Sequence, residues 1–241
     1  MNNVIKQAQE LKEDAKTSKV KAIRMKDTRK LDQALEELNE AIDLLKEEYN
    51  RIKNNKVEYA QYKNDLYQEL ADCYGMKGGI YRRKALLGDD RKYLEDSAQM
   101  YKQGLKYEID DSYNLSNSVV IPILIDPTNL EEKRPKIQEG IKKIEEQVQG
   151  KRRDQWWAWA DLGLFNVLMG NDEAAFKAYG HFTELGARAQ DYESTLTVLS
   201  QLLDSLQTSE SDTPTIKQVA RSINNVMVFL KENKPGEVSL R

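Results

Sequence analysis

The residues that most often carry catalysis are scarce in this chain. It holds a single histidine, His181, and a single cysteine, Cys73. Zinc sites draw their ligands mainly from these two residue types, so an ordinary zinc site is excluded. A nucleophilic Cys–His pair would need the two side chains to meet in the fold. Cys73 stands among packing residues (Leu70, Ala71, Tyr74), which predicts a small buried apolar role. We expect His181 on the inner side of its helix.

Acidic residues are abundant, but they form no catalytic pattern. The chain has 40 Asp and Glu residues, and adjacent pairs such as Asp89-Asp90 and Asp110-Asp111 are typical of solvated charge in such a composition. The Glu-x-x-His spacing of helical di-metal sites does not occur. We therefore expect a protein without enzymatic activity, metal or cofactor.

One segment places glycines beside cations. Gly75, Gly78 and Gly79 precede the run Arg82, Arg83 and Lys84. The pattern of a phosphate-binding P-loop is absent, because no Ser or Thr follows the lysine and no apolar strand precedes the glycines. The glycines are predicted to be positions where long helices approach closely. Arg82, Arg83 and Lys84 remain a candidate anion-binding point at the edge of a groove.

The N-terminal segment is basic although the whole chain is acidic. Residues 1–30 carry nine Lys and Arg against four Asp and Glu, a local charge of +5, whereas the net charge of the chain is −3. This charge can serve as a docking surface for an acidic partner, or it can be the solvated face of a terminal helix. The acidic total makes a general affinity for nucleic acid unexpected.

Composition favours an elongated helical protein. The 241 residues are 32% charged and only 39% apolar, which suits stacked helix pairs that expose much surface. No apolar run is long enough to span a membrane, and the N-terminus lacks the apolar segment of a signal peptide. A single cysteine suits a reducing compartment. We expect a cytoplasmic protein that does not bind membranes.

Helical periodicity extends through most of the chain. The clearest amphipathic helix covers residues 31–55, where Leu31, Leu38 and Leu45 share one face. The apolar run 119–125 has the composition of a strand, but Pro122 inside it and its helical surroundings favour a buried helix. Thr128 or Asn129 is predicted to cap the next helix, at 130–148. Residues 208–214 are predicted to form a mobile loop before a last helix at 216–232.

The stretch 154–182 has the most regular spacing. Trp159, Leu162, Gly163 and Asn166 share a helix face, and Ala175, Tyr179 and Phe182 share another after a turn at Gly170-Asn171. Gly163 and Ala175 are small enough for the two helices to approach closely. We expect Trp159 in the core and at least one of Trp156 and Trp157 on the surface.

These residues resemble the tetratricopeptide (TPR) repeat pattern. The match is best for the spaced residues of 154–182. Residues 113–203 are similar to a divergent TPR region of the TRAF-binding part of stress-kinase regulators and of bacterial signalling or defence proteins. The resemblance implies an all-α, TPR-like solenoid of about five antiparallel helix pairs that acts as a scaffold. The single domain would cover residues 1–233, with pairs at 1–55, 57–108, 112–149, 153–186 and 189–233, and a tail at 234–241. The pair 57–108 is expanded, with a long first helix or an insertion at 82–92.

In TPR arrays the first helix of each pair lines the concave face, where peptides bind. The resemblance therefore implies partner-binding residues on these helices. They are Asp65, Gln68, Asp72, Asn114, Asn117, Trp156, Trp157, Arg152 and Arg153. The two asparagines either hold a peptide backbone or cap and bridge neighbouring helices.

Two functions follow. The first is an adaptor or regulatory subunit that binds a partner protein or peptide and is fused to, or in complex with, an effector. The alternative is a sensor that binds a small anion or an oligonucleotide at Arg82, Arg83 and Lys84.

Overall fold

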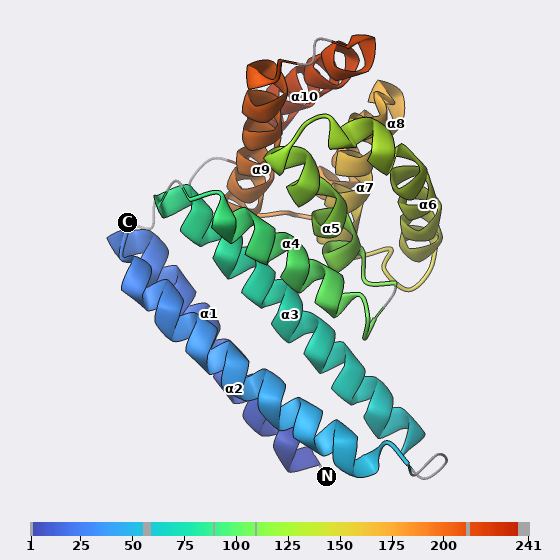
Figure 1. The fold of residues 1–241 in the computed structure, drawn as a ribbon. Coiled ribbons are helices and arrows are strands. Elements are labelled where there is room, and N and C mark those ends of the chain that lie inside the picture. The colour runs from blue at the N-terminus through green and yellow to red at the C-terminus, as the bar shows by residue number, and fades with distance from the viewer. Residues whose placement is uncertain (1, 55–58, 89, 109, 211–212, 236–241) are drawn as a thin grey trace. The chain divides into compact units, whose positions relative to one another are not determined.

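A computed structural model describes residues 2–54, 59–88, 90–108, 110–210 and 213–235 (Figure 1). Over these residues the chain forms ten α-helices and no strand, which confirms the all-α prediction. In chain order they are α1 (Asn2–Met25), α2 (Thr28–Ile52), α3 (Ala60–Gly88), α4 (Lys92–Gly104), α5 (Ser112–Ile125), α6 (Asn129–Gln149), α7 (Trp156–Met169), α8 (Asp172–Glu184), α9 (Ala189–Thr208) and α10 (Pro214–Asn233).

The chain divides into two compact units, residues 1–118 and 119–241. The boundary falls inside α5, so this helix contributes residues to both units. The prediction of one repeat domain over residues 1–233 stays a prediction. None of the described helices is long and apolar enough to cross a membrane.

In the first unit, α1 and α2 form a hairpin around small side chains. Ala8, Ala15 and Ala22 lie fully buried on one face of α1. The two residues between the helices close the turn: Lys26 adopts a left-handed conformation (φ 51°), and Asp27 caps α2 by accepting a hydrogen bond from the Arg29 amide at 3.0 Å. The hairpin therefore has a short, ordered link.

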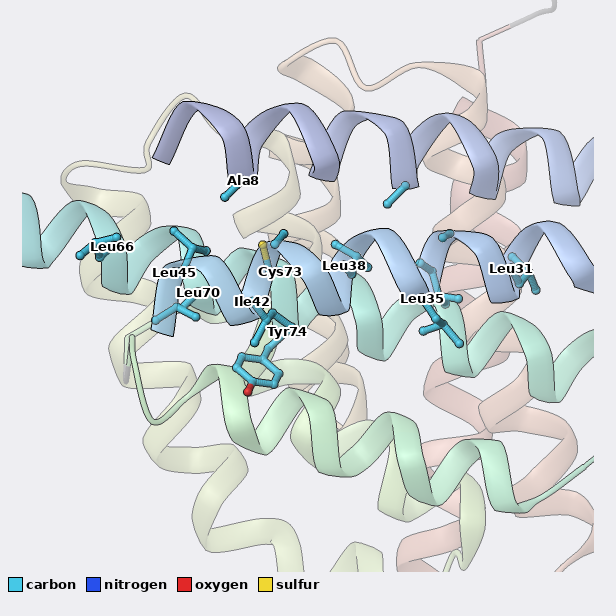
Figure 2. Packing of buried hydrophobic residues seen from close by; sticks show 14 of the residues in the cluster. Ala8, Leu31, Leu35, Leu38, Ile42, Leu45, Leu66, Leu70, Cys73 and Tyr74 are labelled. Carbon is cyan, nitrogen blue, oxygen red and sulfur yellow. The ribbon is translucent and has the colours of Figure 1, made fainter. Parts of the chain in front are cut away.

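Helix α3 packs against α2 through a continuous apolar cluster. Figure 2 shows Leu70, Cys73 and Tyr74 of α3 facing Ile42 and Leu45 of α2. Cys73 is fully buried, and burial raises the pKa of its thiol to about 12, as expected for a small apolar side chain of the core. The helix is 29 residues long. Of the two explanations for the expanded pair 57–108, a long first helix or an insertion at 82–92, the first therefore holds.

At two of the glycines predicted to allow close helix contacts, the neighbouring group is a side chain and not backbone. A Cβ atom on Gly78 would lie 2.9 Å from the ring of Tyr101 in α4. One on Gly75 would lie 2.8 Å from Oδ1 of Asn114 in α5. The absence of a side chain at both positions lets α4 and α5 contact α3, which confirms the interpretation of these glycines.

Residues 119–125 lie in helix α5 and do not form a strand, although their composition allowed one. The helix begins at Ser112 and contains Pro122 in its last turn. Neither predicted cap of α6 forms. Thr128 donates to Oδ1 of Asp126 through both its amide and its hydroxyl, and the Asn129 side chain donates to the Pro122 carbonyl at 3.0 Å. Both side chains thus hold the α5–α6 connection together, because they bond to Asp126 and to the Pro122 carbonyl, which also accepts from the Asp126 amide at 3.0 Å.

The second unit contains the helix pair predicted from the stretch 154–182. Helices α7 and α8 are joined at Gly170, whose φ of 73° requires the freedom of glycine. A Cβ on Gly163 would lie 2.6 Å from the ring of Tyr179, so this glycine permits the predicted close contact. The predicted loop 208–214 is shorter than expected: α9 continues to Thr208, Thr213 caps α10, and residues 211–212 lie outside the described residues, as does most of the tail, 236–241.

Candidate binding surface on helices α1 and α3

Asp72, one of the candidates on α3, lies on the face that meets α1. Lys12 of α1 forms ion pairs with Glu69 at 2.5 Å and with Asp72 at 3.1 Å. Burial lowers the pKa of Lys12, but the hydrogen bonds and charges of these two carboxylates outweigh it, so the pKa is raised. Asp72 is therefore engaged within the fold, while Gln68 is exposed.

Asp65 lies one turn before Gln68 on the same helix. It is partly buried and accepts a hydrogen bond from the Gln61 side chain at 2.9 Å. Asp65, Gln68 and Asp72 thus share the predicted face of α3, but α1 contacts only the last of them in the interactions described above.

Asn114 and Asn117, predicted to hold a peptide backbone or to cap and bridge neighbouring helices, are both buried. Asn114 is fully buried, and its amide donates to the Ala71 carbonyl of α3 at 3.0 Å and to Asp111 at 2.6 Å. Asn117 is 8% exposed and donates to the Tyr113 carbonyl of its own helix at 2.9 Å. The bridging alternative holds for Asn114, because a buried amide already bonded to a neighbouring helix cannot contact a peptide in solvent.

The three tryptophans of α7 are not distributed between core and surface as predicted. Trp159 is only partly buried: its indole donates to the Arg153 carbonyl at 2.8 Å, and its ring lies 4.2 Å from that of His181. His181 is not on the inner side either, since 39% of its side chain is exposed and Nδ1 lies 3.1 Å from Glu184. Trp159 and His181 are thus partly exposed, whereas Phe165 of α7 and Tyr179 of α8 are fully buried.

Trp156 and Trp157 are also partly buried, and their rings contact different parts of the second unit. Trp156 meets the buried ring of Phe182 edge to face, with centroids 5.8 Å apart. The Arg152 guanidinium lies 5.0 Å from the Trp157 ring and donates to Gln147 at 2.9 Å. Trp157 and Arg152 therefore contact each other, and Arg153, the next residue after Arg152, is exposed.

Lys84 does not belong to the predicted anion-binding point. It forms an ion pair with Asp32 of α2 and lies 4.4 Å from the ring of Tyr93. Because successive helical residues point 100° apart, Arg82 and Arg83 leave the helix in other directions. The run of three cations in the sequence is therefore not one cluster in the structure.

Lys19 of α1, and not Lys84, interacts electrostatically with Arg82 and Arg83. Its ammonium lies 3.8 Å from the position that a Cβ on Gly79 would occupy, and the hydroxyls of Tyr113 and Tyr101 lie 3.2 and 3.5 Å from that same position. Burial lowers the pKa of Lys19, and the charges of Arg83 and Arg82 lower it further. The pKa of Arg83 is lowered by burial and then by Arg82. These causes place Lys19 and the two arginines in one electrostatic cluster.

Large apolar side chains are exposed next to this cluster. Helices α1 and α3 run in the same direction beside α2 (Figure 1), and Lys12 is level with Asp72. Ile23, eleven residues beyond Lys12, is therefore level with Arg83, which lies eleven residues beyond Asp72. Four apolar side chains at this end are between 38% and 43% exposed: Val20, Ile23, Leu86 and Leu87.

We call this end of the first unit the basic–apolar surface. It comprises Lys16, Lys19, Val20 and Ile23 of α1 with Arg82, Arg83, Leu86 and Leu87 of α3. The sequence signals for it were the local charge of +5 in residues 1–30 and the Arg82-Arg83 pair. Lys19 was missed because nothing in the sequence indicates which lysine of α1 faces α3.

Groups of three or more His, Cys, Asp or Glu that could hold a metal ion are absent from the described ranges. No protein-family model matches the chain, and comparisons with curated proteins and with solved structures also give no match.

Proposed function

We propose that the chain is a non-enzymatic protein-interaction module, an adaptor or regulatory subunit built as a TPR-like array of helix pairs. The observation that carries this proposal is the basic–apolar surface. Four exposed apolar side chains lie at the same end of the unit as the cations Lys19 and Arg83, and apolar side chains bordered by charged ones are typical of protein-binding surfaces. Apolar contacts supply binding free energy, and the charges select the partner and accelerate association.

The partner that fits this surface is a protein segment with acidic and apolar side chains. Acidic residues would complement the cations of α1 and α3, and apolar residues would cover Ile23 and Leu86. An α-helix with apolar residues at spacings of three and four would present both kinds of side chain. The TPR-like arrangement is supported by the α7–α8 pair, in which Gly163 meets Tyr179 at the close-contact position of the repeat pattern.

A second surface is formed by Trp157, Arg152 and Arg153 in the other unit. Trp157 is partly buried and held by Arg152, so it offers a rigid aromatic contact. It provides an independent comparison for the experiment. We place the protein in the cytoplasm because a lone, reduced Cys73 suits that compartment.

The test is quantitative affinity purification from the native cell with matched variants. The double change Ile23→Glu, Leu86→Glu puts negative charge into the basic–apolar surface, and Trp157→Ala, Arg153→Glu alters the second surface. Val228→Glu is the control, because Val228 is 56% exposed on α10. We expect a partner that is lost with the first variant, retained with the control, and whose acidic segment binds the purified chain less tightly as salt is raised.

Retention of every copurifying protein by the Ile23→Glu, Leu86→Glu variant, with its helical circular dichroism unchanged, would remove this surface from the proposal. Loss confined to the Trp157→Ala, Arg153→Glu variant would move the binding site to the second unit.

A further inference from the structure

Polar groups from three helices converge over Gly79 of α3. The Lys19 ammonium comes from α1, the Tyr101 hydroxyl from α4 and the Tyr113 hydroxyl from α5, and the two hydroxyls are 3.3 Å apart. All three atoms lie within 3.8 Å of the Cβ position that glycine leaves empty. A side chain at residue 79 would occupy the point at which they meet, so glycine keeps this point open.

The cations at this point lack acidic partners. Elsewhere on the same helices cations are paired: Lys12 with Glu69 and Asp72, and Lys84 with Asp32. Lys19 and Arg83 form neither an ion pair nor a hydrogen bond with any of the residues that the structure describes. The groups that act on the charge of Lys19 are all cationic, namely Arg83, Arg82 and Lys16.

This arrangement costs stability unless an anion is present. Two partly buried cations repel each other and are partly removed from water, which is why the pKa values of Lys19 and Arg83 are both lowered. An anion would supply the missing charge and accept hydrogen bonds from the ammonium and the guanidinium.

The geometry points to a binding site for a phosphate group over Gly79, formed by Lys19 and the hydroxyls of Tyr101 and Tyr113, with Arg83 one turn further along the same face of α3. A tetrahedral phosphate can accept from an ammonium, a guanidinium fork and hydroxyl groups at once. A carboxylate has fewer oxygens and a single plane, and it matches donors on three separate helices less well. The site takes a small phosphorylated molecule or inorganic phosphate. It goes beyond the proposed adaptor function and does not depend on it.

The test uses the purified full chain at low ionic strength and titrates inorganic phosphate against NaCl of equal ionic strength. Thermal unfolding and the NMR signal of the Arg83 guanidinium Nε–H are the readouts. We expect a saturable rise in melting temperature with phosphate alone, and a shift of the Arg83 signal that follows the same curve.

Variants separate binding from folding. Lys19→Met and Arg83→Met should each weaken phosphate binding about tenfold or more, because each removes a charge-assisted hydrogen bond. Without phosphate, Lys19→Met should be at least as stable as the parent chain, since it relieves repulsion from the arginines. Lys84→Met is the matched control and should bind phosphate like the parent chain, because its ammonium is paired with Asp32.

The same titration with a mononucleotide shows whether the site prefers an organic phosphate or free phosphate. Tighter binding of the nucleotide than of inorganic phosphate indicates an organic phosphate, and equal or weaker binding indicates free phosphate. The inference is overturned if NaCl reproduces the effect of phosphate, if Lys84→Met loses binding as Lys19→Met does, or if affinity for single-stranded oligonucleotides rises steadily with their length. Because no partner protein takes part, failure here leaves the adaptor proposal unaffected.

Discussion

Asn114 connects three parts of the first unit through one side chain. Its amide bonds to the Ala71 carbonyl of α3 and to Asp111, and its side chain also fills the space beside Gly75 of α3 and Gly104 of α4. An asparagine on the next turn, Asn117, bonds only within its own helix. The two residues look equivalent in the sequence, yet one holds helices together and the other does not.

We predict that Asn114→Ala lowers the free energy of unfolding by about 2 kcal/mol, because it removes two hydrogen bonds and leaves the partners of a buried amide unsatisfied. Asn117→Ala should cost less than about 1 kcal/mol, since it removes one local bond at a site near solvent. Urea denaturation of both variants checks the difference. Equal losses would contradict the bridging role of Asn114.

The buried thiol of Cys73 makes the stability of the fold depend on pH in the alkaline range. Its folded pKa is raised to about 12, above the ordinary value for an unfolded chain of about 8.5. The unfolded state therefore loses its proton first. The contribution of Cys73 is fully present below about pH 8.5 and declines by about 1.4 kcal/mol per pH unit as pH rises toward 12.

Cys73→Ala should accordingly show a smaller loss of unfolding free energy between pH 8 and about pH 10 than the parent chain. In the native parent chain at pH 8, alkylation of the thiol should be roughly a hundredfold or more slower than in urea. Rapid alkylation of the folded chain would show that the thiol is accessible.

At the scale of elements, glycine determines how closely pairs of helices approach. Gly163 faces the buried ring of Tyr179, whereas Gly180, in the partner helix of the same pair, has no atom within 4 Å of its Cβ position. The same substitution therefore has opposite expected effects. Alanine at residue 163 would collide with a ring that is itself packed against Phe182.

Gly163→Ala should destabilise the chain by about 1–3 kcal/mol through overpacking. Gly180→Ala should stabilise it by about 0.5–1 kcal/mol, because alanine favours a helix and nothing opposes it. Thermal unfolding of the two variants tests this contrast. A stabilised Gly163→Ala variant would mean that α7 and α8 are less closely packed than described.

The positions of the helices could be predicted from the sequence, but the side-chain contacts between helices could be predicted only in part. Local periodicity is enough to place α2, α7, α8 and α10, and glycine spacing is enough to predict close approaches. Which of three nearby tryptophans turns inward depends on side chains of another helix, such as Phe182, and the periodicity of α7 alone predicted the wrong one. Lys19 and Gly79 are separated by sixty positions in the chain, and no local pattern connects them.

At the scale of the whole molecule, α5 contains residues of both compact units. It holds the buried Asn114 on one side of the boundary and the buried Val119, Val120 and Ile121 on the other. Each unit also carries its own natural probe. The three tryptophans all lie in residues 119–241, and the only cysteine lies in residues 1–118.

We predict that tryptophan fluorescence and Cys73 alkylation report the same unfolding midpoint in urea, because unfolding of either unit removes packing along α5. Coincident transitions are the standard sign of cooperative unfolding. Two midpoints, with either probe first, would show that α5 separates at the boundary.

The alanines of α1 have a consequence for where its lysines stand. Ala8, Ala15 and Ala22 repeat every seven residues, and so do Lys12, Lys19 and Lys26. A stripe of such small, equal side chains would accept α1 after a slide of one repeat, about 10.5 Å along the axis. The link to α2 forbids the slide. Extended through Lys26 and Asp27, the chain from Met25 to Thr28 reaches about 11 Å at most, whereas a slide of this length between helices about 8 Å apart needs roughly 13 Å. The turn between the first two helices, and not the apolar face of α1, therefore selects which lysine stands beside Arg83.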